Sequence, residues 1–153
     1  MATVSVSADV PASAERTWAT AADLARFGEW LTLHEGWRGE LPAEIAEGTR
    51  LTSVVNVKGL RNRIDWHVDA YDPPRSLAIS GDGVGGVRVS LVLSVVPDGD
   101  HTTVRVDAEI TGKPTTGPVG MIIGRALRGD MRKSVAALSD LVERRPPSGR
   151  STP

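Results

Sequence analysis

The chain has 153 residues, no cysteine and a formal net charge of −1 at pH 7. This length suits one domain with a substantial core, and the absence of cysteine excludes disulfides, thiolate metal sites and cysteine nucleophiles. The first residues lack the basic and unbroken apolar regions of a signal peptide, and no stretch approaches the ~20 apolar residues of a membrane span. We therefore expect a cytoplasmic protein with no membrane span.

The charge is unevenly distributed along the chain. Residues 1–49 carry 3 basic and 8 acidic side chains (net −5), residues 50–116 carry 8 of each, and residues 117–153 carry 7 basic and 3 acidic (net +4). Nucleic-acid-binding domains more often have a pI above ~9, whereas the pI here is about 6.3. A nucleic-acid partner is not expected, and the basic end is read as a solvated helix face with a basic tail.

The N-terminal part predicts one strand and two short helices. Apolar and polar residues alternate over residues 3–10, the period of a half-buried strand. Ser13 can cap a helix that carries Trp18 on its apolar side, and Asp23 can cap a second one that includes Leu24, Phe27 and Leu31.

The central part predicts a loop followed by a sheet. Residues 32–48 contain several glycines and show little periodicity, which indicates a loop near one end of the domain. Strand-like runs then cover residues 50–58, 63–71, 76–80, 87–96 and 102–111, the last two joined by a turn over residues 97–100. With the first strand these make six, and short links require neighbours to be antiparallel. In the run over residues 63–71, we expect the side chains of Ile64, Trp66, Val68 and Ala70 to face inward.

The last predicted element is a long helix from Thr116 or Gly117 to Arg144. Its apolar arc includes Leu127, Met131 and Leu138, while Arg125, Arg128 and Arg132 fall on the opposite side. Asp130 and Ser134 fall inside the apolar arc, where a carboxylate is costly unless it is paired. Residues 1–144 are expected to form one domain, and residues 145–153 a disordered tail.

Several segments together resemble a known superfamily. The stretches DVPASAERTWATAADLARFGEWL and LPAEIAEGTRLTSVV, in this order of elements, resemble the START-related SRPBCC superfamily over residues 3–143, especially its polyketide cyclase/dehydrase and lipid-transport-like members. The resemblance implies an α+β helix-grip (START/Bet v 1-like) fold, in which a curved antiparallel sheet grips the C-terminal helix around a hydrophobic cavity. It implies no single chemistry, because the superfamily includes carriers, sensors, cyclases and hydroxylase subunits.

A narrower resemblance concerns a subgroup. The segments EWLTLHEGWRGELP, KGLRNRIDW and GDGVGGVRV are similar to an actinobacterial subgroup whose mycobacterial member is described as the toxin of a toxin–antitoxin pair. This similarity implies an antitoxin protein as a partner.

Three other motifs predict no catalytic or cofactor site. Gly81, Gly83 and Gly86 satisfy the letters of G-x-G-x-x-G, but a strand follows them where the dinucleotide motif needs a helix. His34, His67 and His101 are assigned to a loop, an outward strand face and a turn, all exposed, and they form no metal set. No G-x-S-x-G elbow is present for a nucleophilic serine. No metal and no cofactor are therefore predicted.

We expect ligand contacts from large apolar side chains and a few polar ones. The candidate ligand-binding residues are Trp30, His34, Trp37, Trp66, Leu127, Asp130, Met131, Ser134 and Leu138. The tryptophans offer flat apolar faces with one N–H donor, although ordinary core packing explains them as well. Asp130 is either a polar anchor in the pocket or half of an ion pair with Arg16 or Arg63. Ser134 either binds a ligand or allows close packing.

Three functions remain open on these grounds. The first is binding of a small hydrophobic, lipid-like or aromatic-polyketide-like ligand between the sheet and the long helix. The second is a cyclase- or dehydrase-type enzyme in which Asp130 or His34 moves a proton, although the sequence shows no convergent acid–base pair. The third is the toxin of a type II toxin–antitoxin pair. Binding is favoured over catalysis, and the oligomeric state is not predicted.

Overall fold

The computed structural model of the chain describes residues 2–32, 34–39, 41–42, 44–57, 60–83, 86–112 and 117–144. Two predicted features, the disordered tail over residues 145–153 and the alternative helix cap at Thr116, lie outside the described residues.

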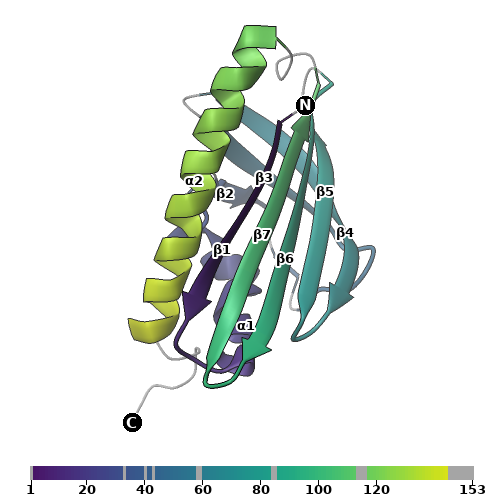
Figure 1. Cartoon of the computed structure of the whole chain (residues 1–153). Coiled ribbons are helices and arrows are strands. Elements are labelled where there is room, and N and C mark those ends of the chain that lie inside the picture. Colours follow the sequence, from purple (N-terminus) through teal and green to yellow (C-terminus); the bar gives the residue numbers. More distant parts are fainter. Residues whose placement is uncertain are drawn as a thin grey trace.

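One curled antiparallel sheet and one long helix define the architecture (Figure 1). In chain order the elements are β1 (Ala2–Val10), α1 (Ala14–Ala21), the 3-10 helix η1 (Leu24–Glu29), β2 (His34–Arg38), β3 (Arg50–Val57), β4 (Leu60–Asp72), β5 (Ser76–Gly83), β6 (Arg88–Asp98), β7 (His101–Thr111) and α2 (Gly117–Arg144). The strand order is β1-β7-β6-β5-β4-β3-β2, and every neighbouring pair is antiparallel. The predicted α+β helix-grip class is confirmed.

The sheet has seven strands, so the predicted count of six is wrong. The missing strand is β2, which lies within the segment predicted as a loop and pairs with β3 through Trp37↔Ser53 and Arg38↔Thr52. The pairing register shifts between His34 and Gly36. Such a bulge breaks the period-two pattern of a strand that is only five residues long, which is why the sequence shows no alternation there.

A second bulge corrects the face assignment of β4. Ile64, Trp66 and Val68 are buried as predicted, but the register of β4 on β5 shifts between Val68 and Ala70. Because one extra residue moves the following side chains to the other face, Ala70 is exposed rather than inward.

Two of the three glycines of the G-x-G-x-x-G segment belong to the sheet. Gly81 and Gly83 lie in β5, which extends beyond the predicted end at Ser80. A Cβ atom at Gly81 would lie 2.6 Å from the backbone oxygen of Asp65 on β4, so a side chain there would clash with the neighbouring strand. The β6–β7 turn is also tighter than predicted: β6 runs to Asp98, β7 starts at His101, and Gly99 has a φ of +65°.

The two short helices begin where the capping residues predict. Ser13 Oγ accepts a hydrogen bond from Arg16 N at 3.1 Å, and the Asp23 carboxylate accepts one from Ala25 N at the same distance. Each cap satisfies a main-chain donor that the first turn of a helix leaves free.

The long helix α2 runs beside β1 along one edge of the sheet (Figure 1). Its inward side chains Leu127, Met131 and Leu138 are at most 1% exposed. The Arg16 side chain on α1 donates a hydrogen bond to the Val142 carbonyl at 2.8 Å, which satisfies one of the acceptors that a helix C-terminus leaves free. None of the helices in the described part of the chain combines the length and the apolar character needed to span a bilayer.

Candidate functional site

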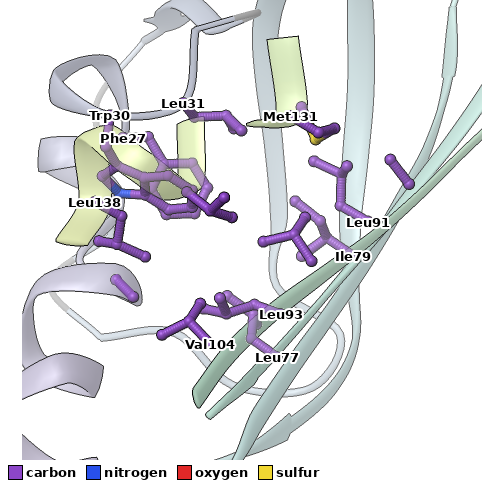
Figure 2. Packing of buried hydrophobic residues seen from close by; sticks show 14 of the residues in the cluster. Phe27, Trp30, Leu31, Leu77, Ile79, Leu91, Leu93, Val104, Met131 and Leu138 are labelled. Atoms are coloured by element: carbon purple, nitrogen blue, oxygen red, sulfur yellow. The ribbon is translucent and has the colours of Figure 1, made fainter. Parts of the chain in front are cut away.

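A small apolar cavity lies between η1 and the inner face of the sheet. Its volume is about 20 Å³. Figure 2 shows Phe27, Trp30 and Leu31 on one side facing side chains of β5 and β6 on the other. The lining residues are Phe27, Trp30, Leu31, Leu77, Ile79, Leu91, Leu93 and Val106. All eight are hydrophobic, so the cavity offers dispersion contacts and almost no hydrogen bonding.

The volume of the cavity limits the size of the molecule that fits inside it in this conformation. A volume of about 20 Å³ is close to that of one water-sized sphere, and a water molecule needs two to four polar partners to stay in such a place. The side chains around the cavity expose no polar atom to it, and only one of them, a tryptophan, carries a polar group at all. The space is therefore an unfilled part of the core, and a larger occupant requires the walls to separate.

The exception is Trp30. Its side chain is 3% exposed, and its buried Nε1 has no hydrogen-bond partner. The two other candidate tryptophans differ: Trp37 Nε1 donates to the Leu24 carbonyl and Trp66 Nε1 donates to Ser53 Oγ, both at 2.7 Å. A buried N–H without an acceptor is rare and costly, and Trp30 is the one candidate tryptophan that has one. This N–H does not form part of the cavity surface, and in Figure 2 the nitrogen lies on the side of the ring that faces away from β5 and β6.

His34 lies in an aromatic cluster behind the cavity wall. Its ring centre is 4.7 Å from that of Trp37 and 6.1 Å from that of Phe27. The prediction of an exposed loop histidine is wrong, because His34 is the first residue of β2 and is 9% exposed. Burial lowers the pKa of His34 below its ordinary value, since the protonated ring loses its hydration.

Asp130 and Ser134 hold the segment between η1 and β2. Thr32 Oγ1 donates to Asp130 Oδ1 at 2.9 Å, and Ser134 Oγ accepts a hydrogen bond from Thr32 N at 2.9 Å. Ser134 Oγ also donates to the Asp130 carbonyl at 2.7 Å. The predicted ion pair of Asp130 with Arg16 or Arg63 is not formed in the described structure. Both polar residues of the apolar arc thus have partners in the protein.

Of the nine predicted ligand-binding residues, only Trp30 lines the cavity. Trp66, Leu127, Met131 and Leu138 are buried in the hydrophobic core that surrounds it. The other lining residues are Phe27 of η1, Leu31 shortly after it, and residues at inward positions of β5, β6 and β7. The alternation of the strands does indicate those inward positions.

A second hollow lies at the surface, beside the start of η1. It is an open groove of about 510 Å³ lined by Ala22, Asp23, Leu24, Ala25, Leu41, Pro42, Glu44, Ile45 and Tyr71. Its lining mixes apolar side chains with two carboxylates, and the sequence did not predict it.

The other two histidines lie outside the cavity, and each contacts an aspartate at the surface. His67 Nε2 is 2.6 Å from Asp69 Oδ1, and His101 Nδ1 is 2.9 Å from Asp9 Oδ2. The Asp9 hydrogen bond raises the pKa of His101 above its ordinary value. Within the described ranges, no three His, Asp or Glu side chains come together as a group that would hold a metal ion.

Comparison with known proteins finds a relative in sequence and two solved structures of similar fold. The chain is 45% identical over 135 residues to a protein of Mycobacterium tuberculosis (strain H37Rv) named Toxin Rv0910, which covers 88% of this chain and 94% of the relative. Among solved structures, a START superfamily protein from Mycobacterium smegmatis superposes with a TM-score of 0.74 at 22% identity, covering 92% of this chain and 97% of the other. The Zhui aromatase/cyclase from Streptomyces sp. R1128 superposes with a TM-score of 0.72 at 19% identity, covering 94% of each.

The two solved structures share the fold with this chain, which agrees with the curled sheet and long helix described above. Residues 1–143 match the family described as polyketide cyclase / dehydrase and lipid transport. The resemblance seen in the sequence is confirmed, and this chain belongs to the polyketide cyclase / dehydrase and lipid transport family.

Proposed function

We propose that this protein binds a small hydrophobic molecule in the cavity between η1 and strands β5, β6 and β7. The observation that carries the proposal is the unfilled, wholly apolar cavity bordered by Trp30, whose indole N–H is buried without a partner. Binding pockets are typically apolar with very few orienting polar groups. When η1 moves outward to admit a ligand and the indole ring turns toward the opened space, a hydroxyl or carbonyl oxygen of that ligand would give the Trp30 N–H its missing acceptor.

The ligand must widen the cavity, because its volume is about 20 Å³ in this conformation. We place the movement in the segment that carries Phe27, Trp30 and Leu31. This segment consists of the short 3-10 helix η1 and the residues that follow it. It leads to Thr32, which is hydrogen-bonded to α2. The opposing wall consists of three adjacent strands of the sheet, which hydrogen bonds hold together. The η1 segment is therefore the wall of the cavity that can move to make room for a ligand.

A panel of matched probes tests the proposal. The members of each pair share one carbon skeleton and differ by a single oxygen atom: benzene and phenol, cyclohexane and cyclohexanone, decane and decanol. Calorimetry should show saturable 1:1 binding, with the oxygenated member of a pair bound roughly threefold to tenfold more tightly, the range expected of one hydrogen bond. Trp30→Phe should remove that preference while keeping hydrocarbon binding. If no pair binds, or if binding is unsaturable, the proposal is wrong.

A second candidate function rests on the relative named as a toxin. The chain shares 45% identity with it over nearly the whole length of both proteins, and such a relationship supports a role as the toxin of a toxin–antitoxin pair with a protein antitoxin. Induced expression in a mycobacterial host tests this candidate: growth arrest supports it and normal growth at high protein level refutes it. No contact in the described structure favours the enzyme alternative, because neither His34 nor Asp130 lines the cavity.

A further inference from the structure

The outward face of α2 carries cations that have no partner among the residues that the structure describes. Arg125, Arg128, Arg132 and Lys133 are exposed, and none of them forms an ion pair or side-chain hydrogen bond with a described residue. Elsewhere, Arg61 pairs with Glu35 at 2.8 Å, and Arg26, Arg75, Arg88 and Arg105 also have carboxylate partners. These four cations lie between residues 125 and 133 of one helix, and the exposed carboxylates of α2, Asp140 and Glu143, come later, near its C-terminal end.

The same face also carries exposed apolar side chains. Met121 is 66% exposed and Ile122 is 51% exposed, two of the three large hydrophobic residues with high exposure in the described part of the chain. At 100° per residue, Met121, Arg125, Arg128 and Arg132 fall within an arc of about 60°, with Ile122 beside them. Apolar and cationic groups therefore form one continuous stripe, which we call the α2 stripe.

The residues of the α2 stripe are exposed. The N-terminal turns of α2 project beyond the end of the sheet in Figure 1. None of its residues lines the cavity or the groove. The carboxylate nearest in sequence, Asp130, is turned to the other side and bound by Thr32. A partner would meet a convex, protruding helix with local positive charge and two apolar side chains at its tip.

We infer that the α2 stripe docks on an anionic lipid surface. Such a surface attracts clustered arginine and lysine side chains, and the acyl boundary beneath the headgroups accepts apolar side chains such as Met121 and Ile122. A lipid surface can bind without a groove in the protein, because it contacts a convex helix from one side. A nucleic-acid backbone would use the cations but not the exposed methionine and isoleucine, so the lipid surface fits more of the stripe. This inference does not depend on the cavity being occupied.

Vesicle sedimentation with the full chain tests the inference. Vesicles of phosphatidylcholine are compared with vesicles in which roughly a third of the lipid is phosphatidylglycerol. We expect binding to the anionic vesicles only, weakened by added salt because salt screens exposed charges. The double variant Arg125→Gln/Arg128→Gln should bind about tenfold or more weakly, and Met121→Ser/Ile122→Ser should also lose affinity.

The matched control is Arg50→Gln/Arg63→Gln. It removes the same charge from two exposed arginines of β3 and β4 that have no described side-chain partner. This variant should bind anionic vesicles like the wild type. Equal loss in both double variants, or equal binding to neutral vesicles, would overturn the inference. So would tighter binding of duplex DNA or polyglutamate than of vesicles, since either would assign the stripe to another class of partner. If the first variant melts at a lower temperature, Arg132→Gln/Lys133→Gln replaces it.

Discussion

The main-chain N–H of Thr32 donates a hydrogen bond to Ser134 Oγ at 2.9 Å, which joins the link between η1 and β2 to the middle of α2. The Thr32 hydroxyl adds a second connection to Asp130. Because η1 forms one wall of the cavity, these contacts fix how far that wall lies from the sheet. They are the physical connection between the long helix and access to the cavity.

Ser134→Ala should loosen this connection. The substitution leaves the Thr32 N–H without its acceptor, and we expect a loss of about 1–3 kcal/mol in the free energy of unfolding. Apolar probes should also associate faster, because the η1 wall separates more easily. The control is Ser139→Ala on the same helix, whose longer 3.5 Å hydrogen bond to the Asp9 carbonyl should be worth less than about 0.5 kcal/mol. Equal effects of the two variants in urea unfolding would contradict this account.

Two valines of β7 provide a matched test of the cavity. Val106 lines the cavity, whereas Val104 is fully buried in the core and does not line it. Val106→Ile adds a methylene next to free volume, so stability should hold or rise while probe binding is lost. Val104→Ile adds the same methylene to filled space and should cost about 1–3 kcal/mol. Thermal unfolding and calorimetry measure both effects, and an unchanged probe affinity in Val106→Ile would place the ligand elsewhere.

The buried His34 predicts a loss of stability in acid. Its pKa is lowered by burial from an ordinary value of 6.5. The unfolded chain therefore takes up a proton at a higher pH than the folded chain does. Stability due to this residue is fully present above pH 6.5 and falls as the pH drops through the folded-state pKa. The difference in unfolding free energy between pH 8 and pH 5 should shrink in His34→Gln, as measured by urea titration. An identical difference in wild type and variant would be inconsistent with this role.

The exposed pair of His101 and Asp9 should change stability with pH in the opposite direction to His34. The hydrogen bond from Asp9 raises the pKa of His101 above 6.5. Its contribution to stability is fully present below pH 6.5 and is lost as the pH rises through the folded-state pKa. In Asp9→Asn, an NMR titration of the His101 ring should give a pKa closer to 6.5. A titration curve that does not move would show that the pair is not formed in solution.

The cavity variant Val106→Ile also tests whether toxicity depends on ligand binding. If expression of the protein arrests growth, Val106→Ile tests whether the arrest needs the cavity. Arrest by the wild type but not by the variant would connect the two candidate functions. Arrest by both would mean that toxicity uses a surface of the protein, with the cavity playing no part in it.

Local sequence signals predicted much of the fold. The alternation in β4 identified Ile64, Trp66 and Val68 as buried, and Ser13 and Asp23 marked the starts of two helices. The edge strand β2 was missed because it is short and contains a bulge, so its stability comes from pairing with β3 rather than from its own pattern. A bulge also explains why Ala70 was wrongly predicted to face inward, since residue propensities do not indicate where a strand gains an extra residue.

The candidate site was less predictable than the fold. The pattern on α2 placed Asp130 and Ser134 on the inward side, but their partner Thr32 is 98 and 102 residues away in the chain. Periodicity gives the direction of a side chain along its own element and not the group that it meets. The cavity likewise depends on how η1 stands over β5, β6 and β7, a relationship between distant segments. Trp30 was identified because a tryptophan is large and carries an N–H, whatever its partners.

The most direct test of the central claim is the indole N–H signal of Trp30 in a ¹H–¹⁵N NMR spectrum during titration with cyclohexanone. Trp37 and Trp66 serve as internal controls, because their N–H groups already donate to Leu24 and Ser53. The account predicts a saturable shift of the Trp30 signal, assigned with Trp30→Phe, while the other two move little. A Trp30 signal that stays in place, or a uniform drift of all indole signals, would contradict a ligand in the cavity.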